Sequence, residues 1–264
     1  MLCRAALDSH TIDAASFTMI RLLSGAVMLA LLVAIPQRKA PWSVDGNLIS
    51  ALALFVYAIA FSFAYLSLGA GTGALILFTF VQITMLAIGI IKGEHPKPLE
   101  IVGMLVALGG VVYLVLPGLK APPLLSAALM ACAGAAWGLY SFRGRSAPNA
   151  IAATAGNMAI AAPFGLLVWL TTGAHTDWAP RGALLAAISG AITSGLGYVC
   201  WYKALPGLSS TRAAVVQLSV PALTAVGAVL ILNEEFTPRR VAATVLTLGG
   251  VAITIAAHQM KRDG

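Results

Sequence analysis

Residues 73–91 read GALILFTFVQITMLAIGII, a run of 19 residues without a charged side chain. At a rise of about 1.5 Å per residue, a helix of this length crosses the roughly 30 Å hydrocarbon core of a bilayer. Similar runs recur along the chain and are separated by short connectors that carry Pro, Gly or charge. The nine predicted spans are residues 17–35, 48–68, 73–91, 99–116, 124–142, 150–171, 182–205, 211–232 and 241–258.

The composition agrees with a membrane protein. Hydrophobic residues make up 59% of the 264 residues and charged residues only 9%, whereas a soluble globular chain carries about 25% charged residues. Backbone groups in lipid must form their hydrogen bonds within the segment, so uninterrupted apolar runs of this length are expected to be helices. The sequence therefore predicts an all-α polytopic membrane protein whose first partner is the lipid bilayer.

The formal net charge of +7 does not indicate a nucleic-acid partner, because the 16 Lys and Arg lie singly or in pairs between the apolar runs. The three Cys and four His show no metal-ligand spacing, and no phosphate loop, dinucleotide fingerprint or hydrolase motif occurs. We therefore predict no enzyme activity, no cofactor and no metal site.

The distribution of positive charge predicts the orientation. Short connectors make neighbouring helices antiparallel, so alternate loops lie on opposite sides of the membrane. One side carries ten Lys and Arg: Arg38, Lys39, Lys92, Lys97, Arg143, Arg145, Lys203, Arg212, Lys261 and Arg262. The other carries six: Arg4, Arg21, Lys120, Arg181, Arg239 and Arg240. The positive-inside rule then places the C-terminus in the cytoplasm and the N-terminus outside.

The chain also repeats itself. Four tracts of the first half match tracts of the second half at offsets of 136 to 140: residues 42–46 with 178–182, 65–68 with 202–205, 94–98 with 234–238, and 108–111 with 248–251. We interpret residues 1–117 and 118–264 as two repeats. Units with an odd number of spans face opposite ways in the membrane, which is the inverted-repeat architecture of secondary transporters.

The second repeat contains five spans, beginning with residues 124–142. An offset of 136 places the counterpart of that first span at about positions −12 to 6, so most of that counterpart would lie before residue 1. We expect nine spans in this chain where the architecture has ten, with residues 1–13 forming the last turn of the opening helix and a loop.

This pattern resembles the drug/metabolite transporter superfamily, specifically its EamA-type members. The resemblance rests on the following residues: Glu94 with Gly109-Gly110-Val111, Glu234-Glu235 with Gly249-Gly250-Val251, Arg21, Gly134-Ala-Ala-Trp137-Gly138 with Tyr140, and Pro221. It implies ten helices in two inverted five-helix repeats. It also implies export or exchange of small metabolites, amino acids or drugs across the inner membrane by alternating access.

Polar residues inside spans are costly and often functional. Gln82 and Gln217 lie within apolar runs, and Asn157 aligns with Arg21 at an offset of 136. These amides are candidates to orient a polar group of a solute. The alternative for each is an interhelical hydrogen bond, worth about 0.6–2 kcal/mol in membranes.

Arg21 is the one cation set inside an apolar run. Two readings stay open, attraction of an anionic solute or extension of the side chain to the lipid headgroups. The resemblance adds a cavity or gating role for it.

Two aromatic groups are candidates for a cavity wall. Trp137 and Tyr140 share one helical face, and Tyr198 shares a face with Trp201 and Tyr202. Aromatic walls suit apolar or amphipathic solutes, and the alternative is an interfacial aromatic belt. We favour the cavity for Trp137 and the belt for Trp201 and Tyr202.

Glu94 and Glu234 precede helices, and we favour helix capping over proton coupling for both. The sequence thus predicts a secondary transporter with a central cavity lined by Arg21, Gln82, Trp137, Tyr140, Asn157, Tyr198 and Gln217. The alternatives are a truncated, non-transporting paralogue or subunit, and a membrane-embedded enzyme, for which no acidic, His or Ser/Lys cluster is present. A small-molecule solute is the expected partner; its identity stays open, as does homodimer formation.

Overall fold

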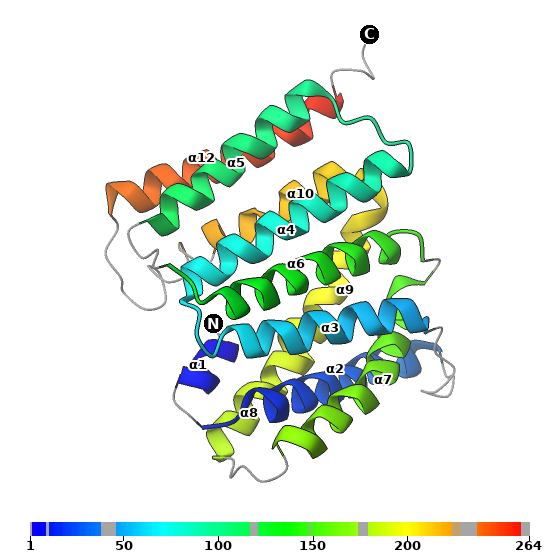
Figure 1. Cartoon of the computed structure of the whole chain (residues 1–264). Coiled ribbons are helices and arrows are strands. Elements are labelled where there is room, and N and C mark those ends of the chain that lie inside the picture. Colours follow the sequence, from blue (N-terminus) through cyan, green and yellow to red (C-terminus); the bar gives the residue numbers. More distant parts are fainter. Residues whose placement is uncertain are drawn as a thin grey trace. The chain divides into compact units, whose positions relative to one another are not determined.

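The structure is a computed structural model that describes residues 2–8, 11–37, 46–116, 121–147, 149–173, 179–223, 226 and 237–259. Within these residues the regular structure is helical and no strand occurs (Figure 1). The predicted all-α class is therefore confirmed. The pairs Arg38–Lys39, Glu234–Glu235 and Lys261–Arg262 lie outside the described residues, as do Trp42 and Trp178.

The helices follow the predicted spans closely. They are α1 (Leu2–Asp8), α2 (Ala14–Gln37), α3 (Leu48–Ala64), α4 (Ala70–Ile91), α5 (Pro98–Val115), α6 (Leu124–Gly144), α7 (Ala150–Val168) with η2 (Trp169–Gly173), α8 (Pro180–Ile188), η3 (Ser189–Leu196), α9 (Gly197–Ala204), η4 (Leu205–Gly207), α10 (Ser210–Gln217) and α12 (Pro238–Gln259). Both α5 and α12 begin at the proline of the repeated tract, since Pro is favoured in the first turn of a helix.

Seven of the helical segments are long and apolar enough to cross a membrane, and α3 is a shorter apolar helix of 17 residues. The predicted span at residues 211–232 is helical up to residue 217 and again over 219–223, and its remainder is described only at residue 226. The chain is therefore a polytopic membrane protein.

Contacts divide the chain into two compact units that cut across the predicted repeats. Unit 1 consists of Met1–Ala70 and Pro122–Gly207, and unit 2 consists of Gly71–Ala121 and Leu208–Gly264. Each unit thus takes helices from both halves of the sequence, and each is described by itself below.

In unit 2, α5 and α12 form an antiparallel pair (Figure 1). Lys97, at the start of α5, donates to the carbonyl of Ala257 near the end of α12 over 2.6 Å. At the other end, Nε of Arg239 donates to the carbonyl of Tyr113 over 2.9 Å. The two helices therefore run in opposite directions along their whole contact.

Glycines permit this close approach. A Cβ on Gly110 would lie 2.6 Å from the backbone nitrogen of Thr247, and one on Gly103 would lie 2.7 Å from the carbonyl oxygen of Gly250. Small residues at contact positions are the usual means by which helices approach closely in membranes.

In unit 1, α3 packs against α6, and α2 packs against both α7 and η3. The side chain of Arg143 at the end of α6 donates to Ser50 and Asn47 at the start of α3, over 2.9 Å each. These two helices therefore also run antiparallel, which brings their middle turns together.

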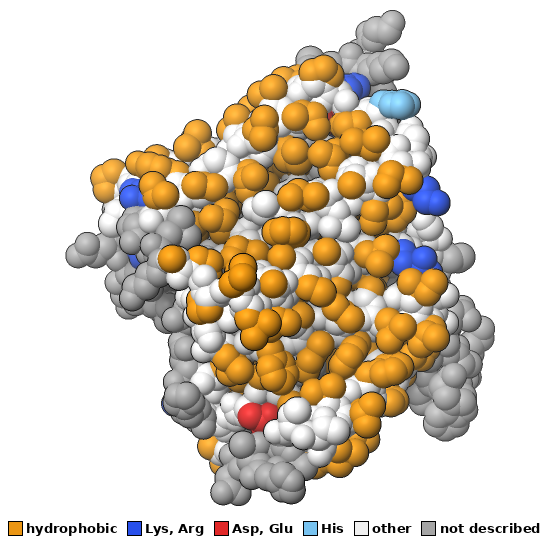
Figure 2. Space-filling view, in the orientation of Figure 1, with side chains coloured by type: hydrophobic (Ala, Val, Ile, Leu, Met, Phe, Trp, Pro, Cys, Tyr) orange, Lys and Arg blue, Asp and Glu red, His pale blue; other side chains and the backbone are white. Residues whose placement is uncertain are grey.

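Large hydrophobic side chains remain exposed on the outer helix faces; they include Val27, Leu105, Leu167 and Val245. Figure 2 shows one face of the molecule, where hydrophobic side chains predominate and few charged groups interrupt them. Such a surface is unfavourable in water and is satisfied by lipid chains.

Candidate functional site

Arg21 is buried inside unit 1. Its side chain is only 8% exposed. Nε donates to the hydroxyl of Ser194 over 3.1 Å, and Nη2 donates to the hydroxyl of Tyr57 over 3.1 Å. The guanidinium carbon also lies 5.3 Å from the ring centre of Tyr57 and 5.7 Å from that of Phe61, within the range of a cation–π contact.

The partners of Arg21 are neutral. In the part of the chain that the structure describes, no Asp or Glu carboxylate lies within 4 Å of its guanidinium. The side chain points to Ser194 and Tyr57 and is enclosed, which contradicts the reading that it extends to the lipid headgroups. The positive charge is held among rings and hydroxyl groups.

The local backbone explains how Ser194 reaches Arg21. Residues Ser189–Leu196 form a π-helical segment, in which the hydroxyl of Thr193 donates to the carbonyl of Ser189 over 2.6 Å. A Cβ on Gly190, one turn before Ser194, would lie 2.9 Å from the carbonyl carbon of Arg21. Only glycine allows α2 to approach this closely, and widened helical turns of this type are frequent at functional sites.

Aromatic rings continue from Arg21 across unit 1. The ring of Tyr57 lies 4.9 Å from that of Trp137, and Trp137 lies 5.1 Å from Tyr198 and 5.9 Å from Tyr140. Tyr202 follows at 5.8 Å from Tyr140. We call Tyr57, Phe61, Trp137, Tyr140, Tyr198 and Tyr202 the aromatic cluster. Its rings contact one another, so in this conformation they fill the space between their helices.

Tyr202 corrects one prediction. We assigned it to an interfacial belt, but the side chain is 3% exposed and packs on Tyr140 and Tyr198. Tyr202 shares its helical face with Tyr198, and this face points into unit 1, where both rings are buried. Trp201 is half-buried, and its Nε1 donates to the hydroxyl of Ser141 over 3.4 Å.

Asn157 lies next to the aromatic cluster but has a structural bond as well. Its Oδ1 accepts a hydrogen bond of 2.8 Å from the backbone nitrogen of Asn47, just before α3. The buried hydroxyl of Tyr140 has no hydrogen-bond partner among the described residues. Asn157 positions the start of α3.

Gln82 and Gln217 belong to unit 2. Nε2 of Gln82 donates to the carbonyl of Ala214 over 2.7 Å, while its buried Oε1 has no hydrogen-bond partner among the described residues. Nε2 of Gln217 lies 3.4 Å from the sulfur of Met85 and 3.5 Å from the carbonyl of Ala213. Both amides thus serve α4–α10 packing. The acceptor that has no hydrogen-bond partner among the described residues is Oε1 of Gln82.

The two described acidic residues of unit 2, Glu94 and Glu100, have structural partners. The carboxylate of Glu94 accepts hydrogen bonds from the backbone nitrogen and the hydroxyl of Ser210, over 2.8 and 3.1 Å. Capping is therefore confirmed for Glu94, although the capped helix is α10 rather than the helix that follows in sequence; Glu234 lies outside the described residues. Glu100 is 4% exposed; it accepts from the backbone nitrogen of Lys97 and lies 3.7 Å from Nε of Arg212. The sequence analysis missed Glu100.

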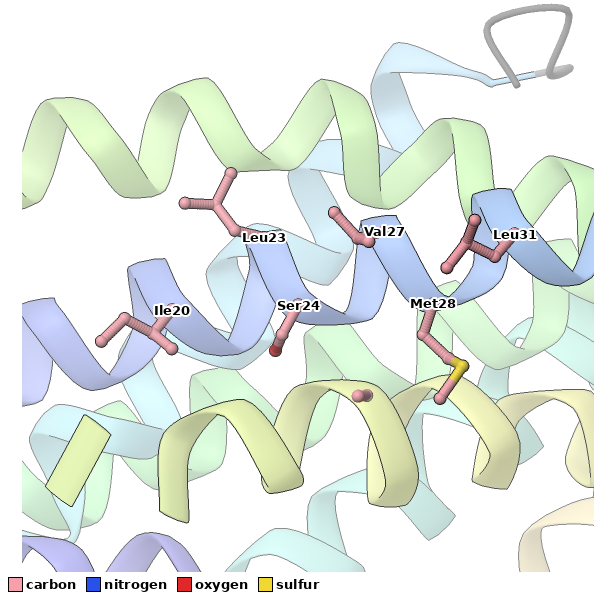
Figure 3. Close-up of a pocket in the computed structure, with 7 residues that line it drawn as sticks. Ile20, Leu23, Ser24, Val27, Met28 and Leu31 are labelled. Atoms are coloured by element: carbon pink, nitrogen blue, oxygen red, sulfur yellow. The ribbon is translucent and has the colours of Figure 1, made fainter. Parts of the chain in front are cut away.

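An apolar groove of about 420 Å³ lies elsewhere in unit 1 (Figure 3). Its lining residues come from one face of α2 and from η3: Ile20, Leu23, Ser24, Val27, Met28, Leu31 and Ala191. None of the predicted site residues is among them. Because it presents almost no polar group, this groove does not explain recognition of a polar solute.

Three further residues of the Arg21 site were missed from the sequence, namely Tyr57, Phe61 and Ser194. Tyr57 carries a hydroxyl group in the middle of an apolar run, and this feature of the sequence could have identified it as a candidate. Phe61 is one helical turn from it. Ser194 stands among small residues with nothing to distinguish it.

The comparisons with known proteins agree with this architecture. The model of the EamA-like transporter family matches residues 1–116 and 124–256. This chain therefore belongs to the EamA-like transporter family, which is part of the drug/metabolite transporter superfamily.

Among similar proteins is an uncharacterized protein of Pseudomonas aeruginosa, 48% identical over 256 residues, which cover 97% of this chain and 89% of that protein. An uncharacterized transporter of Archaeoglobus fulgidus is 28% identical over 180 residues, or 64% of this chain and 61% of the other. One crystal structure superposes with a TM-score of 0.77 at 17% identity, covering 96% of this chain and 93% of that one. That likeness shows the fold alone.

Proposed function

We propose that the protein is a secondary transporter that exports or exchanges a small metabolite, amino acid or drug across the inner membrane. Two inverted repeats would expose one central site alternately to each side. The C-terminus would be cytoplasmic. The observation that carries the proposal is the buried Arg21, which lies against the aromatic cluster and has no carboxylate partner among the described residues.

The packing of unit 2 supports the inverted repeats. Gly110 packs on Thr247, and Gly250 packs on Ala107. Gly110 and Gly250 are 140 residues apart, as are Ala107 and Thr247, and 140 is an offset of the sequence repeat. The two contacts are therefore equivalent under exchange of α5 and α12. These helices run antiparallel, which is the relation that an inverted repeat requires of equivalent elements.

The chemistry of the Arg21 site supports transport rather than catalysis. Its groups are a guanidinium, hydroxyls and aromatic rings, which bind and orient a solute without activating a nucleophile. Ser194 donates or accepts as a hydroxyl, and no general base lies beside it among the described residues. Binding followed by release on the other side is the activity that this arrangement favours.

A test does not require the solute to be known in advance. The purified protein is reconstituted in liposomes loaded with a small-molecule extract of bacterial cytoplasm. Mass spectrometry then compares the retained compounds with those in liposomes that hold heat-inactivated protein. We expect selective, saturable loss of one compound or one chemical class. Equal retention of every compound in both preparations would refute transport.

A further inference from the structure

The charge of Arg21 is not compensated within the described structure. A guanidinium remains protonated in proteins, and a buried charge inside a membrane protein is costly unless it is paired. The hydroxyls of Tyr57 and Ser194 and the faces of Tyr57 and Phe61 lower this cost but carry no negative charge. An anion is the partner that this site lacks.

The guanidinium also has donors to spare. It carries five N–H groups, and the two hydrogen bonds to Ser194 and Tyr57 occupy two of them. A carboxylate fits the remaining edge with two parallel N–H···O bonds, the geometry in which Arg binds most strongly. The hydroxyls of Ser194 and Tyr57 accept from Nε and Nη2 and hold the guanidinium in place, so Nη1 and the second N–H of Nη2 stay available to a ligand.

The surroundings select the rest of the ligand. The ring of Tyr57, which contacts Arg21, lies 4.9 Å from the ring of Trp137, and Trp137 lies 5.1 Å from Tyr198. A ligand with one anionic group and an apolar or aromatic body satisfies both parts, whereas inorganic phosphate or a dicarboxylate leaves negative charge facing rings.

We propose that Arg21, with Tyr57 and Ser194, binds the carboxylate of a small organic acid whose apolar or aromatic body packs against Trp137 and Tyr198. This inference rests on the proposed transport function and names its substrate class. The rings contact one another in this conformation, so the body would enter between them as the helices of unit 1 separate.

Binding is tested with probes that share one body and differ in charge. Thermal unfolding of the purified protein is followed with phenylacetate, phenylacetamide and phenethylamine, and with acetate and inorganic phosphate as anions without the body. Phenylpyruvate and 4-methyl-2-oxopentanoate extend the set of carboxylates. We expect at least one of the three apolar carboxylates (phenylacetate, phenylpyruvate and 4-methyl-2-oxopentanoate) to raise the Tm by about 2 °C or more in a saturable way. Phenylacetamide, phenethylamine, acetate and inorganic phosphate should give no shift.

Variants locate the site. Arg21→Gln should abolish the shift, and Tyr57→Phe, which keeps the ring, should weaken it about tenfold in apparent affinity. Arg145→Gln is the matched control, because Arg145 also lies over a ring, that of Phe142 at 5.0 Å, but outside the aromatic cluster. It should leave the response unchanged. If Arg21→Gln unfolds, Arg21→Lys and Tyr57→Phe keep the test decisive.

The proposal is overturned if none of the three carboxylates stabilises the protein, if the amide or the amine stabilises it equally, or if Arg21→Gln responds like the wild type. Carboxylate binding without any efflux from the loaded liposomes would uphold this site and refute the transport function. Efflux of only neutral or cationic compounds, undiminished in Arg21→Gln, would uphold transport and refute the carboxylate site.

Discussion

Glu94 caps a helix that begins more than a hundred residues further along the chain. Its carboxylate accepts hydrogen bonds from both the backbone nitrogen and the hydroxyl of Ser210, the first residue of α10. A negative charge at this position satisfies free N–H groups and complements the helix dipole. The carboxylate thereby ties the end of α4 to the start of α10 within unit 2.

Replacement of Glu94 by Ala should therefore destabilise unit 2. We expect a loss of about 1–2 kcal/mol, the typical cost of removing a helix cap, measured by thermal or SDS-induced unfolding in detergent. Lys92→Ala, at an exposed position on the same turn, is the control and should change little. If Glu94→Gln instead left stability unchanged and removed a pH dependence of transport, a proton-coupling role would replace the capping role.

Neighbouring glycines in α5 should differ sharply in tolerance. A side chain on Gly110 meets the backbone of α12, whereas a Cβ on Gly109 has no atom within 4 Å. Gly110→Leu should separate the helices and cost about 1–3 kcal/mol as overpacking, and Gly109→Leu should be nearly neutral. Comparison of the two unfolding temperatures, with expression in the membrane as a second readout, tests the pair. Equal tolerance of both would contradict the packing described here.

Gly190 should be needed for the Arg21 site. Gly190→Ala forces α2 away from η3, since its Cβ would press on the carbonyl group of Arg21. We expect a loss of about 1–3 kcal/mol together with loss of ligand-induced stabilisation. Gly197→Ala, where the Cβ has no atom within 4 Å, is the matched control. A Gly190→Ala protein that binds and unfolds like the wild type would show that the close approach is not required.

Arg21→Gln should not destabilise the protein in the absence of ligand. A buried charge without an ionic partner carries a desolvation cost, and its removal relieves that cost; residues kept for binding are often retained at the expense of stability. The expected Tm is therefore equal to that of the wild type or higher. A fall of several degrees would mean that Arg21 serves as a structural bond to Tyr57 and Ser194.

The orientation is tested at the C-terminus. A fluorescent reporter fused after Gly264 should mature, and alkaline phosphatase at the same position should stay inactive, because the positive-inside rule predicts a cytoplasmic location for the side richer in Lys and Arg. A fusion after residue 121, between α5 and α6, should give the opposite pattern. Phosphatase activity at Gly264 would reverse the proposed topology.

Much of the fold follows from local sequence. The run at residues 73–91 predicted α4, which spans Ala70–Ile91, because an apolar segment in lipid has no alternative to internal hydrogen bonding. The spans predicted at residues 99–116 and 241–258 correspond to α5 and α12, which begin slightly earlier, at Pro98 and Pro238. Arg21 and Trp137 were identified as candidates because a cation and a large ring are unusual within an apolar helix. Their roles in binding remain predictions.

The partners could not be predicted in the same way. Residue spacing states which side chains share a helix face, but not which other helix that face meets. The sequence therefore offered no means of pairing Arg21 with Ser194, 173 residues away, or Glu94 with Ser210. It also placed Tyr202 in an interfacial belt, whereas packing of α9 turns this ring into unit 1.

The sequence by itself determined that this protein crosses the membrane many times and that short tracts of its first half recur in the second, since hydropathy and matching tracts are local properties of the chain. Tertiary structure alone decided that compact units mix helices of both halves. It also decided that Arg21 is enclosed by neutral hydroxyls and rings. The physical reason is that burial and pairing of a charge depend on contacts between helices, which small residues such as Gly190 permit and no local pattern specifies.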